Sequence, residues 1–259
     1  MQAAAIAVAT SGSFLGTFKA NQGNVLYYDL ENGQRRARAR LEQALGNIPR
    51  PEELEFRFEA PRIGEGLEED ICRWHESVAN PALVIIDILA RVRKPLPKGQ
   101  PQTYNSDHDL IRALTALAQD LHIAIVVLTH VTKASAADPF DEIGGSMGIT
   151  GASDSNYVLR KEGGEMDASL HMLGRDIEQA SYALARDKLG GWRYLGDAGE
   201  LRVAGTRRDI LYHLHREKSG TPKQIADGLG LREDLVRQTL RRMYDDQQVG
   251  CAGGCYQAL

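Results

Sequence analysis

The feature that most constrains the fold is the segment at residues 81–93, which reads PALVIIDILARVR. Its five apolar residues, 82–86, run without alternation into Asp87. A strand that is apolar on both sides indicates a parallel sheet with both faces covered. Open sheets of this kind bind ligands at the carboxyl ends of their strands, where Asp87 stands. Taken alone, the segment is also consistent with a core strand that ends at a solvated aspartate.

The bulk composition is that of an ordinary soluble protein. A chain of 259 residues has room for one large α/β domain and a small module. With a net charge of -4, any contact with nucleic acid must be local. The three cysteines, Cys72, Cys251 and Cys255, suit a reducing compartment. The first residues resemble neither a signal peptide nor a membrane span, so we expect a cytoplasmic protein without membrane contact.

Apolar strands alternate with amphipathic helices over the first half of the chain. Residues 2–9 have the composition of the end of a helix. Strands are expected at residues 24–30, 54–58, 82–86 and 123–128, and helices between them at residues 34–45, 67–78 and 107–120. This alternation predicts a parallel sheet with right-handed crossovers.

A different pattern follows the last of these strands. The Gly-, Ser- and Asp-rich segment 133–155 is too long for an idle connection. Four short β-like runs come next, at residues 156–160, 168–173, 181–186 and 192–195, and we interpret them as an antiparallel extension of the same sheet. The pattern breaks around residues 196–205. We therefore expect two domains, residues 1–200 and 206–259.

Three of the parallel strands end in polar groups that should share one edge of the sheet: Glu31, Asp87 and His130. A magnesium–nucleotide site needs one carboxylate for the water shell of the metal, a second to polarise an attacking water, and a neutral polar group near the γ-phosphate. Each residue alone is weak support for such a site. Their occurrence on consecutive strands makes the nucleotide site a specific hypothesis.

Five segments of the chain carry a family resemblance. In order, they read VLYYDLENGQRRARARL, ALVIID, YNSDHDLIRALTALAQDLHIAIVVLTHVTK, DPFDEIGGSMGITGASDS and LGRD. They resemble the RecA-like ATPases of the RepA hexameric helicase type, also called the AAA_25 family, over roughly residues 5–196. The resemblance implies a RecA-like P-loop NTPase fold, ATP and Mg²⁺ as ligands, DNA as partner, and self-association into a ring, usually a hexamer.

The resemblance also implies roles for the residues at the sheet edge. Asp87 matches the Walker B position, which holds Mg²⁺ through water, and Glu31 matches the catalytic glutamate that orients the hydrolytic water. His130 matches a histidine that senses the γ-phosphate. Thr129 replaces a second histidine often found before it, and Lys133 ends the same motif.

A second set of roles concerns the neighbouring subunit and DNA. Arg175, in LGRD, resembles an arginine finger that reaches the nucleotide of the next subunit. Residues 144–152 lie where the family places contacts in the central DNA channel. The plainer interpretations are that Glu31 is a solvated turn residue, that Arg175 is a surface arginine, and that the arginines of residues 35–40 form a solvated face paired with Glu42.

The main departure from the family is the phosphate loop. The sequence contains no G-x-x-x-x-G-K-[ST], and SGSFLG at residues 11–16 reads as a loop without the needed lysine. In the family this loop precedes the helix in which Met1 falls, and its strand is usually flanked by those carrying Glu31 and Asp87. We therefore expect an N-terminally truncated sheet and weak or absent ATPase activity. A truncated gene and a nucleotide-free relative are the two explanations.

The C-terminal residues support an independent prediction. TPKQ at residues 221–224 is a capping box with proline at the first helical position, and Gly230 ends that helix. A second helix is expected at residues 233–246 and a hairpin, turning at Gly253 and Gly254, at residues 248–258. The expected core is formed by Ile210, Leu211, Leu214, Ile225, Ala226, Leu229, Leu235, Val236, Leu240 and Met243. This pattern predicts a winged helix-turn-helix.

The outward positions of the second helix are Arg237, Gln238, Arg241 and Arg242. Residues 207–242 contain nine Lys and Arg against five Asp and Glu, a local excess of +4 in a chain of net charge -4. A basic helix in an acidic protein favours phosphate contacts, although such domains also dock proteins. The cysteines in C-x₃-C at residues 251–255 lack a second ligand pair for a metal and are better interpreted as hairpin residues.

The sequence therefore favours an ATP-dependent DNA motor, a RepA-like replicative helicase of a plasmid, phage or mobile element. The alternative is a protein of another functional class, a non-catalytic DNA-binding regulator of replication that acts through its C-terminal domain. A recombination or helicase-loading ATPase would use the same site chemistry.

Overall fold

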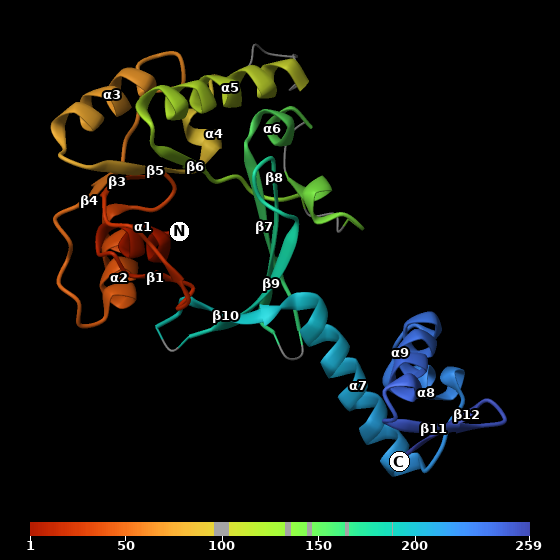
Figure 1. Cartoon of the computed structure of the whole chain (residues 1–259). Helices are drawn as coiled ribbons and strands as arrows, with labels where there is room; N and C mark the ends of the chain where they lie inside the picture. The colour runs from red at the N-terminus through yellow and green to blue at the C-terminus, as the bar shows by residue number, and fades with distance from the viewer. Residues whose placement is uncertain (96–103, 133–135, 144–146, 164–165, 188) are drawn as a thin grey trace.

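The computed structural model of the chain describes residues 1–95, 104–132, 136–143, 147–163, 166–187 and 189–259. It contains a parallel sheet covered by helices, an antiparallel sheet beside it, and a helical unit at the C-terminus (Figure 1). Within the described part of the chain, no helix combines the length and apolar character needed to cross a bilayer.

The parallel sheet has the strand order β4-β3-β5-β6. Its strands are β3 (Asn24–Asp29), β4 (Leu54–Arg57), β5 (Pro81–Asp87) and β6 (Ala124–Val127), close to the expected positions. The strands β3 and β5 pair directly, with Asp29 opposite Asp87. Their backbone groups bond to each other over almost the whole length of both strands, so no strand lies between them in the described sheet.

Helices cover both faces of this sheet (Figure 1). The helices α1 (Gln2–Ala9) and α2 (Gln34–Leu45) pack on one face, where Tyr27 and Ile85 are buried. The helices α3 (Leu67–Ser77) and α5 (Tyr104–Leu121) cover the other face together with the single turn α4 (Leu89–Val92). Because apolar strand residues face helices on both sides, the unbroken apolar run of β5 is explained. The helix α5 begins three residues before the predicted start.

The second sheet is antiparallel and has the order β10-β9-β8-β7. Its strands lie near the four predicted runs: β7 (Ser155–Lys161), β8 (Ala168–Gly174), β9 (Ala180–Arg186) and β10 (Trp192–Asp197). Among the described residues no strand of this sheet pairs with the parallel one, so the predicted extension is instead a separate sheet.

Segment 11–19 is a short hairpin and not the expected loop. Its strands are β1 (Ser13–Phe14) and β2 (Phe18–Lys19). The ring of Phe18 stacks on Tyr182 of β9 at a centroid distance of 5.4 Å, and Leu15 is buried with Leu184. The hairpin therefore packs an aromatic and apolar surface onto the antiparallel sheet.

The segment between the two sheets is partly helical. It contains the 3₁₀ helix η1 (Pro139–Glu142) and the helix α6 (Met147–Ala152). Asp138 caps η1 by accepting a hydrogen bond from the Phe140 amide at 2.9 Å. The prediction of one long loop therefore missed two short elements, which local caps and turns stabilise.

The C-terminal residues form three helices and a hairpin. They are α7 (Ala198–Glu217), α8 (Pro222–Leu229), α9 (Glu233–Asp245), β11 (Val249–Ala252) and β12 (Cys255–Ala258). The predicted capping box of Thr221 and Gln224 is present. The hairpin turns at Gly253 and Gly254, whose positive φ angles of 59° and 81° favour glycine. Around residues 196–205, where we expected the pattern to break, β10 ends at Asp197 and the helix α7 then runs without a break from Ala198.

The predicted C-terminal core is correct except at one position. Nine of the ten predicted side chains are buried or partly buried in one cluster, joined by Val249. Leu235, however, is 42% exposed, and Thr239 is buried on α9 in its stead. Thr239 tolerates burial because its hydroxyl donates to the Leu235 carbonyl at 2.8 Å.

A polar cluster around Asp70 fastens α3 to the strands beneath it. Asp70 accepts hydrogen bonds from Tyr28 at 2.8 Å, from Arg57 at 2.6 Å and from Arg73 at 2.9 Å. Burial works to raise the pKa of Asp70, but these donors lower it below its ordinary value. The charged carboxylate therefore stabilises the fold fully above the ordinary pKa of an aspartate, and the contribution is lost as the pH falls from there through the lowered pKa of Asp70.

We expect Asp70→Asn to lower the free energy of unfolding at pH 7 by roughly 1–3 kcal/mol. The difference from the wild type should shrink as the pH falls below about 4, where the carboxyl group of the unfolded chain takes up a proton, and should disappear below the lowered pKa of the folded protein. Denaturant unfolding at both pH values measures this. Asp109→Asn, at a side chain that is 79% exposed, is the control. A difference that does not change with pH would contradict the assignment.

Candidate functional site

Backbone hydrogen bonds hold three strand ends together at the carboxyl edge of the parallel sheet. The Leu30 amide donates to the Asp87 carbonyl at 2.7 Å, and the Leu128 amide donates to the Ile86 carbonyl at 2.9 Å. The Leu89 amide in turn donates to Leu128 at 2.9 Å. The residues that follow β3, β5 and β6 are therefore fixed relative to one another, as the sequence predicts for Glu31, Asp87 and His130.

Asp87 is oriented by a buried tyrosine. The hydroxyl of Tyr27 donates to Asp87 Oδ2 at 2.7 Å. Burial raises the pKa of Tyr27, and the negative charge of Asp87 and this hydrogen bond raise it further, so the phenol remains a donor. Among the described residues no hydrogen bond is made to Asp87 Oδ1, so this oxygen is available to a ligand.

A second carboxylate fixes the turn that carries Glu31. Asp29 is 1% exposed and lies opposite Asp87 in the sheet. Its Oδ1 accepts hydrogen bonds from the backbone amide of Asn32 at 3.1 Å and from the Asn32 side chain at 2.9 Å. This local bonding closes the turn after β3 and places Glu31 between two fixed residues. Arg40 Nη1 donates to Asn32 Oδ1 at 3.4 Å from α2.

Glu31 and His130 meet at the surface. His130 Nε2 lies 3.3 Å from Glu31 Oε1, and the two side chains are 76% and 47% exposed. These residues are 99 positions apart in the chain, and only the parallel sheet brings them together. An accessible carboxylate beside an imidazole can orient a water molecule and exchange protons with it.

The amino end of α1 lies at the same edge. Burial lowers the pKa of the Met1 amino group, while the negative charges of Asp87 and Asp29 oppose this effect and that of Arg40 adds to it. The side chain of Gln2 also donates to the Ala37 carbonyl of α2 at 3.4 Å. The positive end of a helix dipole favours negative charge, so it offsets part of the repulsion between Asp87 and Asp29 at this edge.

The remaining residues expected at this edge have different positions. Thr129 is exposed next to His130. Lys133 lies outside the described residues, as do residues 144–146 of the expected channel segment. Arg175 lies apart from the cluster, at the end of β8, where Nη2 donates to the Gly151 carbonyl at 3.4 Å and Nη1 is 3.6 Å from Asp154.

The side chains predicted on the outer face of α9 are all exposed: Arg237, Gln238, Arg241 and Arg242. Arg237 is paired with Glu233 one turn earlier. Cys251 lies opposite Tyr256 and Cys255 lies opposite Ala252, so the two thiols face opposite sides of the hairpin. Neither a shared metal nor a disulfide fits that geometry, and the described residues contain no cluster of three metal-ligating side chains.

Sequence reasoning missed Tyr27, Asp29 and Asn32. The segment YYDLEN drew attention to Glu31 alone, because an apolar strand with internal tyrosines reads simply as core. The signal that could have identified them is the period of two along β3, which places Tyr27 and Asp29 on one face.

The profile of the AAA_25 family, described as an AAA domain, matches residues 1–136, more than half of the 259 residues. The chain belongs to the AAA_25 family. The matched part contains β3, β5 and β6 together with Glu31, Asp87 and His130. No curated protein matches the chain.

A solved structure has a fold similar to that of this AAA_25 member. A DnaB-like replicative helicase, described together with its interactions with primase, matches with a TM-score of 0.55 at 15% identity, over 67% of this chain and 51% of the helicase chain. At that identity the likeness shows the fold alone. The chain spans about half the length of that helicase. The RadB recombinase matches with a TM-score of 0.45 at 17% identity, over 67% of this chain and 79% of that chain.

We expect Tyr27→Phe to destabilise the protein by roughly 1.5–3 kcal/mol, because it leaves the Asp87 carboxylate without its buried donor. The measurement is denaturant unfolding at pH 7, with Tyr212→Phe, at a residue that is 70% exposed, as the control. If both variants were as stable as the wild type, the hydrogen bond from Tyr27 to Asp87 would contribute nothing to the free energy of unfolding.

Proposed function

We propose that this AAA_25 chain is an ATP-dependent DNA motor and supplies the residues of its ATP site that act in hydrolysis. The motor would be a replicative helicase of the RepA type from a plasmid, phage or mobile element. The observation that carries the proposal is the meeting of Glu31, Asp87 and His130 at one edge of the sheet, with Glu31 and His130 3.3 Å apart. Recombination and helicase-loading ATPases use the same site chemistry and remain within this proposal.

The residues at the edge fit the roles of a nucleotide site. The oxygen of Asp87 that Tyr27 leaves unbonded would hold Mg²⁺ through water, and Asp29 adds negative charge beside it. The metal supplies charge neutralisation for the phosphates. Glu31 would accept a proton from the attacking water, and the neighbouring imidazole of His130 would hydrogen-bond the γ-phosphate.

Arg175 would act on the neighbouring subunit. Its guanidinium is 64% exposed, and its polar contacts are with Gly151 and Asp154. A ring of subunits, hexameric in the expected form, would place this cation against the phosphates held by the next chain.

The C-terminal helices and hairpin support a winged-helix DNA-binding unit. The helix α9 has a buried face formed by Val236, Leu240 and Met243, and its opposite face presents Arg237, Gln238, Arg241 and Arg242. These side chains would contact phosphates or base edges if α9 enters a groove of the duplex.

The alternative is a regulator of replication that binds DNA through this unit and does not use ATP. The absence of G-x-x-x-x-G-K-[ST] from the sequence favours it. The complete set of Glu31, Asp87, His130 and Arg175 favours the motor.

Nucleotide-dependent assembly separates the two functions. We expect Mg-ATP to drive the full chain into a larger assembly, measured by analytical ultracentrifugation, and Asp87→Asn to prevent this because Mg²⁺ loses its ligand. Asp120→Asn, at an exposed position on α5, is the matched control. A chain that binds DNA but keeps one sedimentation coefficient with and without Mg-ATP would support the regulator.

ATP turnover by the purified chain should be weak or absent, because no phosphate loop holds the β- and γ-phosphates. Phosphate release measured with and without DNA tests this. If ATP turnover were well above the background rate and Glu31→Gln abolished it, the edge residues would be sufficient for hydrolysis without a phosphate loop.

We expect Arg241→Ala to weaken binding to duplex DNA and to reduce the slope of log K against log salt concentration by about 1, as loss of one phosphate contact does. Arg38→Ala, on α2 and paired with Glu42 at 2.8 Å, should change neither quantity. Fluorescence anisotropy over a range of salt concentrations measures both. Equal losses in the two variants would indicate a general charge effect.

A further inference from the structure

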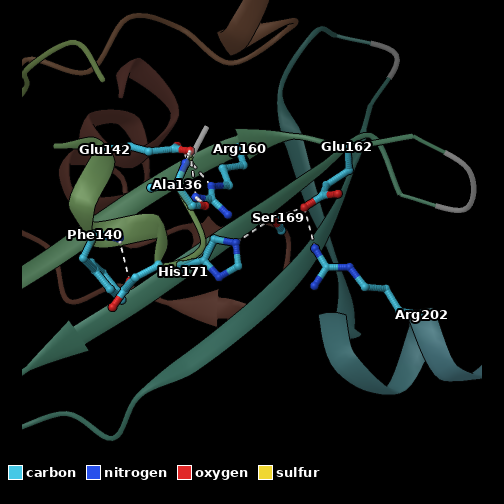
Figure 2. Close-up of polar contacts among 9 residues, drawn as sticks. Ala136, Phe140, Glu142, Arg160, Glu162, Ser169, His171 and Arg202 are labelled. Atoms are coloured by element: carbon cyan, nitrogen blue, oxygen red, sulfur yellow. Dashed lines mark hydrogen bonds and ion pairs between the residues drawn. The ribbon is translucent and has the colours of Figure 1, made fainter. Parts of the chain in front are cut away.

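A buried ion pair fastens the segment after His130 to the antiparallel sheet (Figure 2). Glu142 of η1 is 6% exposed and accepts hydrogen bonds from Arg160 Nη2 at 2.7 Å and Nε at 3.1 Å. The Ala136 amide donates to the same carboxylate at 3.0 Å, and the Ala136 carbonyl accepts from Arg160 Nη2 at 2.8 Å. Arg160 on β7 therefore holds both ends of the segment 136–142.

This ion pair also fixes the position of the chain next to His130. The Thr132 amide donates to the Glu142 carbonyl at 2.7 Å, and Val131 forms an antiparallel bridge with Ile143. His130 is the residue before this bridge. Any movement of Glu142 therefore moves the backbone that carries the imidazole facing Glu31.

Next to Arg160, a chain of hydrogen bonds crosses the sheet (Figure 2). Ser169, the cross-strand partner of Arg160, donates to Glu162 Oε1 at 2.6 Å. Since that bond uses its only proton, the 2.9 Å contact with His171 requires Nε2 to be the donor. His171 Nδ1 then accepts from Ser181 Oγ at 2.7 Å. Ser169 and His171 are 0% and 8% exposed, so the chain is shielded from water.

The environment of His171 fits the neutral ring that this pattern requires. Burial lowers the pKa of His171, and the positive charges of Arg160 and Arg202 lower it further. The bonds therefore point in one direction, from Ser181 through His171 and Ser169 to Glu162. If Glu162 were withdrawn, the direction would reverse only when both hydroxyl groups rotate and the ring proton of His171 moves from Nε2 to Nδ1. The direction of the chain is therefore tied to the position of Glu162.

Glu162 is bonded in turn to α7. Arg202 Nη2 donates to Glu162 Oε1, the oxygen that Ser169 also uses. Two turns further along the same helix, Ile210 and Leu214 are buried in the core of the C-terminal unit. Because α7 is one continuous helix from Ala198 to Glu217, a displacement of that unit acts on Arg202 and through it on Glu162 (Figure 1).

We propose that a polar relay couples the position of the C-terminal unit to the position of His130. It consists of the Glu142–Arg160 ion pair and the chain of Ser169, His171, Glu162 and Arg202, which the β7–β8 pairing of Arg160 with Ser169 joins. Glu142 and Arg160 are positioning residues for His130, and Glu162 and Arg202 transmit the state of α7. That duplex DNA is the ligand acting on the C-terminal unit rests on the proposed function. The coupling itself rests on the fold alone.

The test is residue-resolved amide exchange on the full chain, measured by NMR. Glu162→Gln keeps the shape of the side chain but removes the charge that holds Arg202. The Thr132 and Ala136 amides, which are bonded to Glu142, should then exchange roughly 2- to 30-fold faster, the range of coupling through such networks. Arg216→Ala, which breaks only a pair with the adjacent Glu217 on α7, should leave them unchanged.

Coupling is reciprocal, so the opposite end must respond as well. Glu142→Gln should speed exchange of the Glu200 amide, which Asp197 caps at 2.9 Å at the start of α7. Slow amides of the parallel sheet, such as Ile85, report on global unfolding in each variant. The proposal would be wrong if exchange became faster only at the end of the relay that carries the substitution. It would also be wrong if exchange at Ile85 became faster by the same factor, because that would indicate global destabilisation.

Duplex DNA separates this inference from the proposed function. In the wild type, bound DNA should change exchange at Thr132, and Glu162→Gln should abolish that response without abolishing binding. A wild-type chain that binds no DNA would refute the proposed DNA-binding unit, while the exchange results without DNA would still decide the relay. If DNA still changed exchange at Thr132 in the Glu162→Gln variant, the relay would not be the route by which DNA binding reaches Thr132, and the proposal would be wrong.

Discussion

The pairing of β3 with β5 is the constraint on which the rest of the structure depends. It places Asp29 opposite Asp87 and brings Tyr27 to the same face, so that a buried phenol donates to Asp87 at 2.7 Å. Two carboxylates on adjacent strands would repel each other in an apolar environment. Asp29 is bonded by Asn32 and Asp87 by Tyr27, and these donors offset part of that repulsion. The same bonds orient the turn with Glu31.

The order of strands follows from how each one is covered. Unbroken apolar runs such as β5 are stable only where helices bury both faces, and α1 with α2 on one side and α3 with α5 on the other meet that need. The sheet of β7 to β10 is covered in part on both faces: Ala183 packs with Ala198 of α7 and Leu184 with Leu15 of the β1–β2 hairpin. Tyr157 and Leu159 of β7 are exposed. A sheet covered in this way is better closed by antiparallel neighbours than by a place in the parallel sheet.

Local sequence signals predicted those parts of the molecule that local physics determines. The apolar run of β5, the capping box at Thr221 and the Gly253–Gly254 turn were each identified, because burial pattern, side-chain capping and positive φ leave direct marks in the sequence. The edge with Glu31, Asp87 and His130 followed from the rule that parallel strands end together. Leu235 was wrongly assigned to the core. Helical periodicity shows which side of α9 is apolar, but not how far along the helix a neighbouring element covers that side.

The features that could not be predicted from the sequence depend on contacts between segments that are far apart in the chain. The direct contact of β3 with β5 and the independence of the second sheet are choices among strands of similar composition, so no single segment encodes them. The role of Tyr27 also needs the register, since its partner is 60 residues away. Glu142, Arg160 and His171 lie in segments that read as loop and half-exposed strand, and only their packing in three dimensions makes them a network.

The candidate site and the relay use the same residue types under opposite conditions. Glu31 and His130 are exposed and share one long contact, so each retains lone pairs or protons for a ligand. In the relay, by contrast, Glu142, Ser169 and His171 are buried and bonded to other polar groups, which makes rearrangement costly unless several bonds change together. Groups of the first kind can do chemistry, whereas groups of the second kind can hold or transmit a position. Because Thr132 and Glu142 join the two, the accessible site inherits its geometry from the buried network.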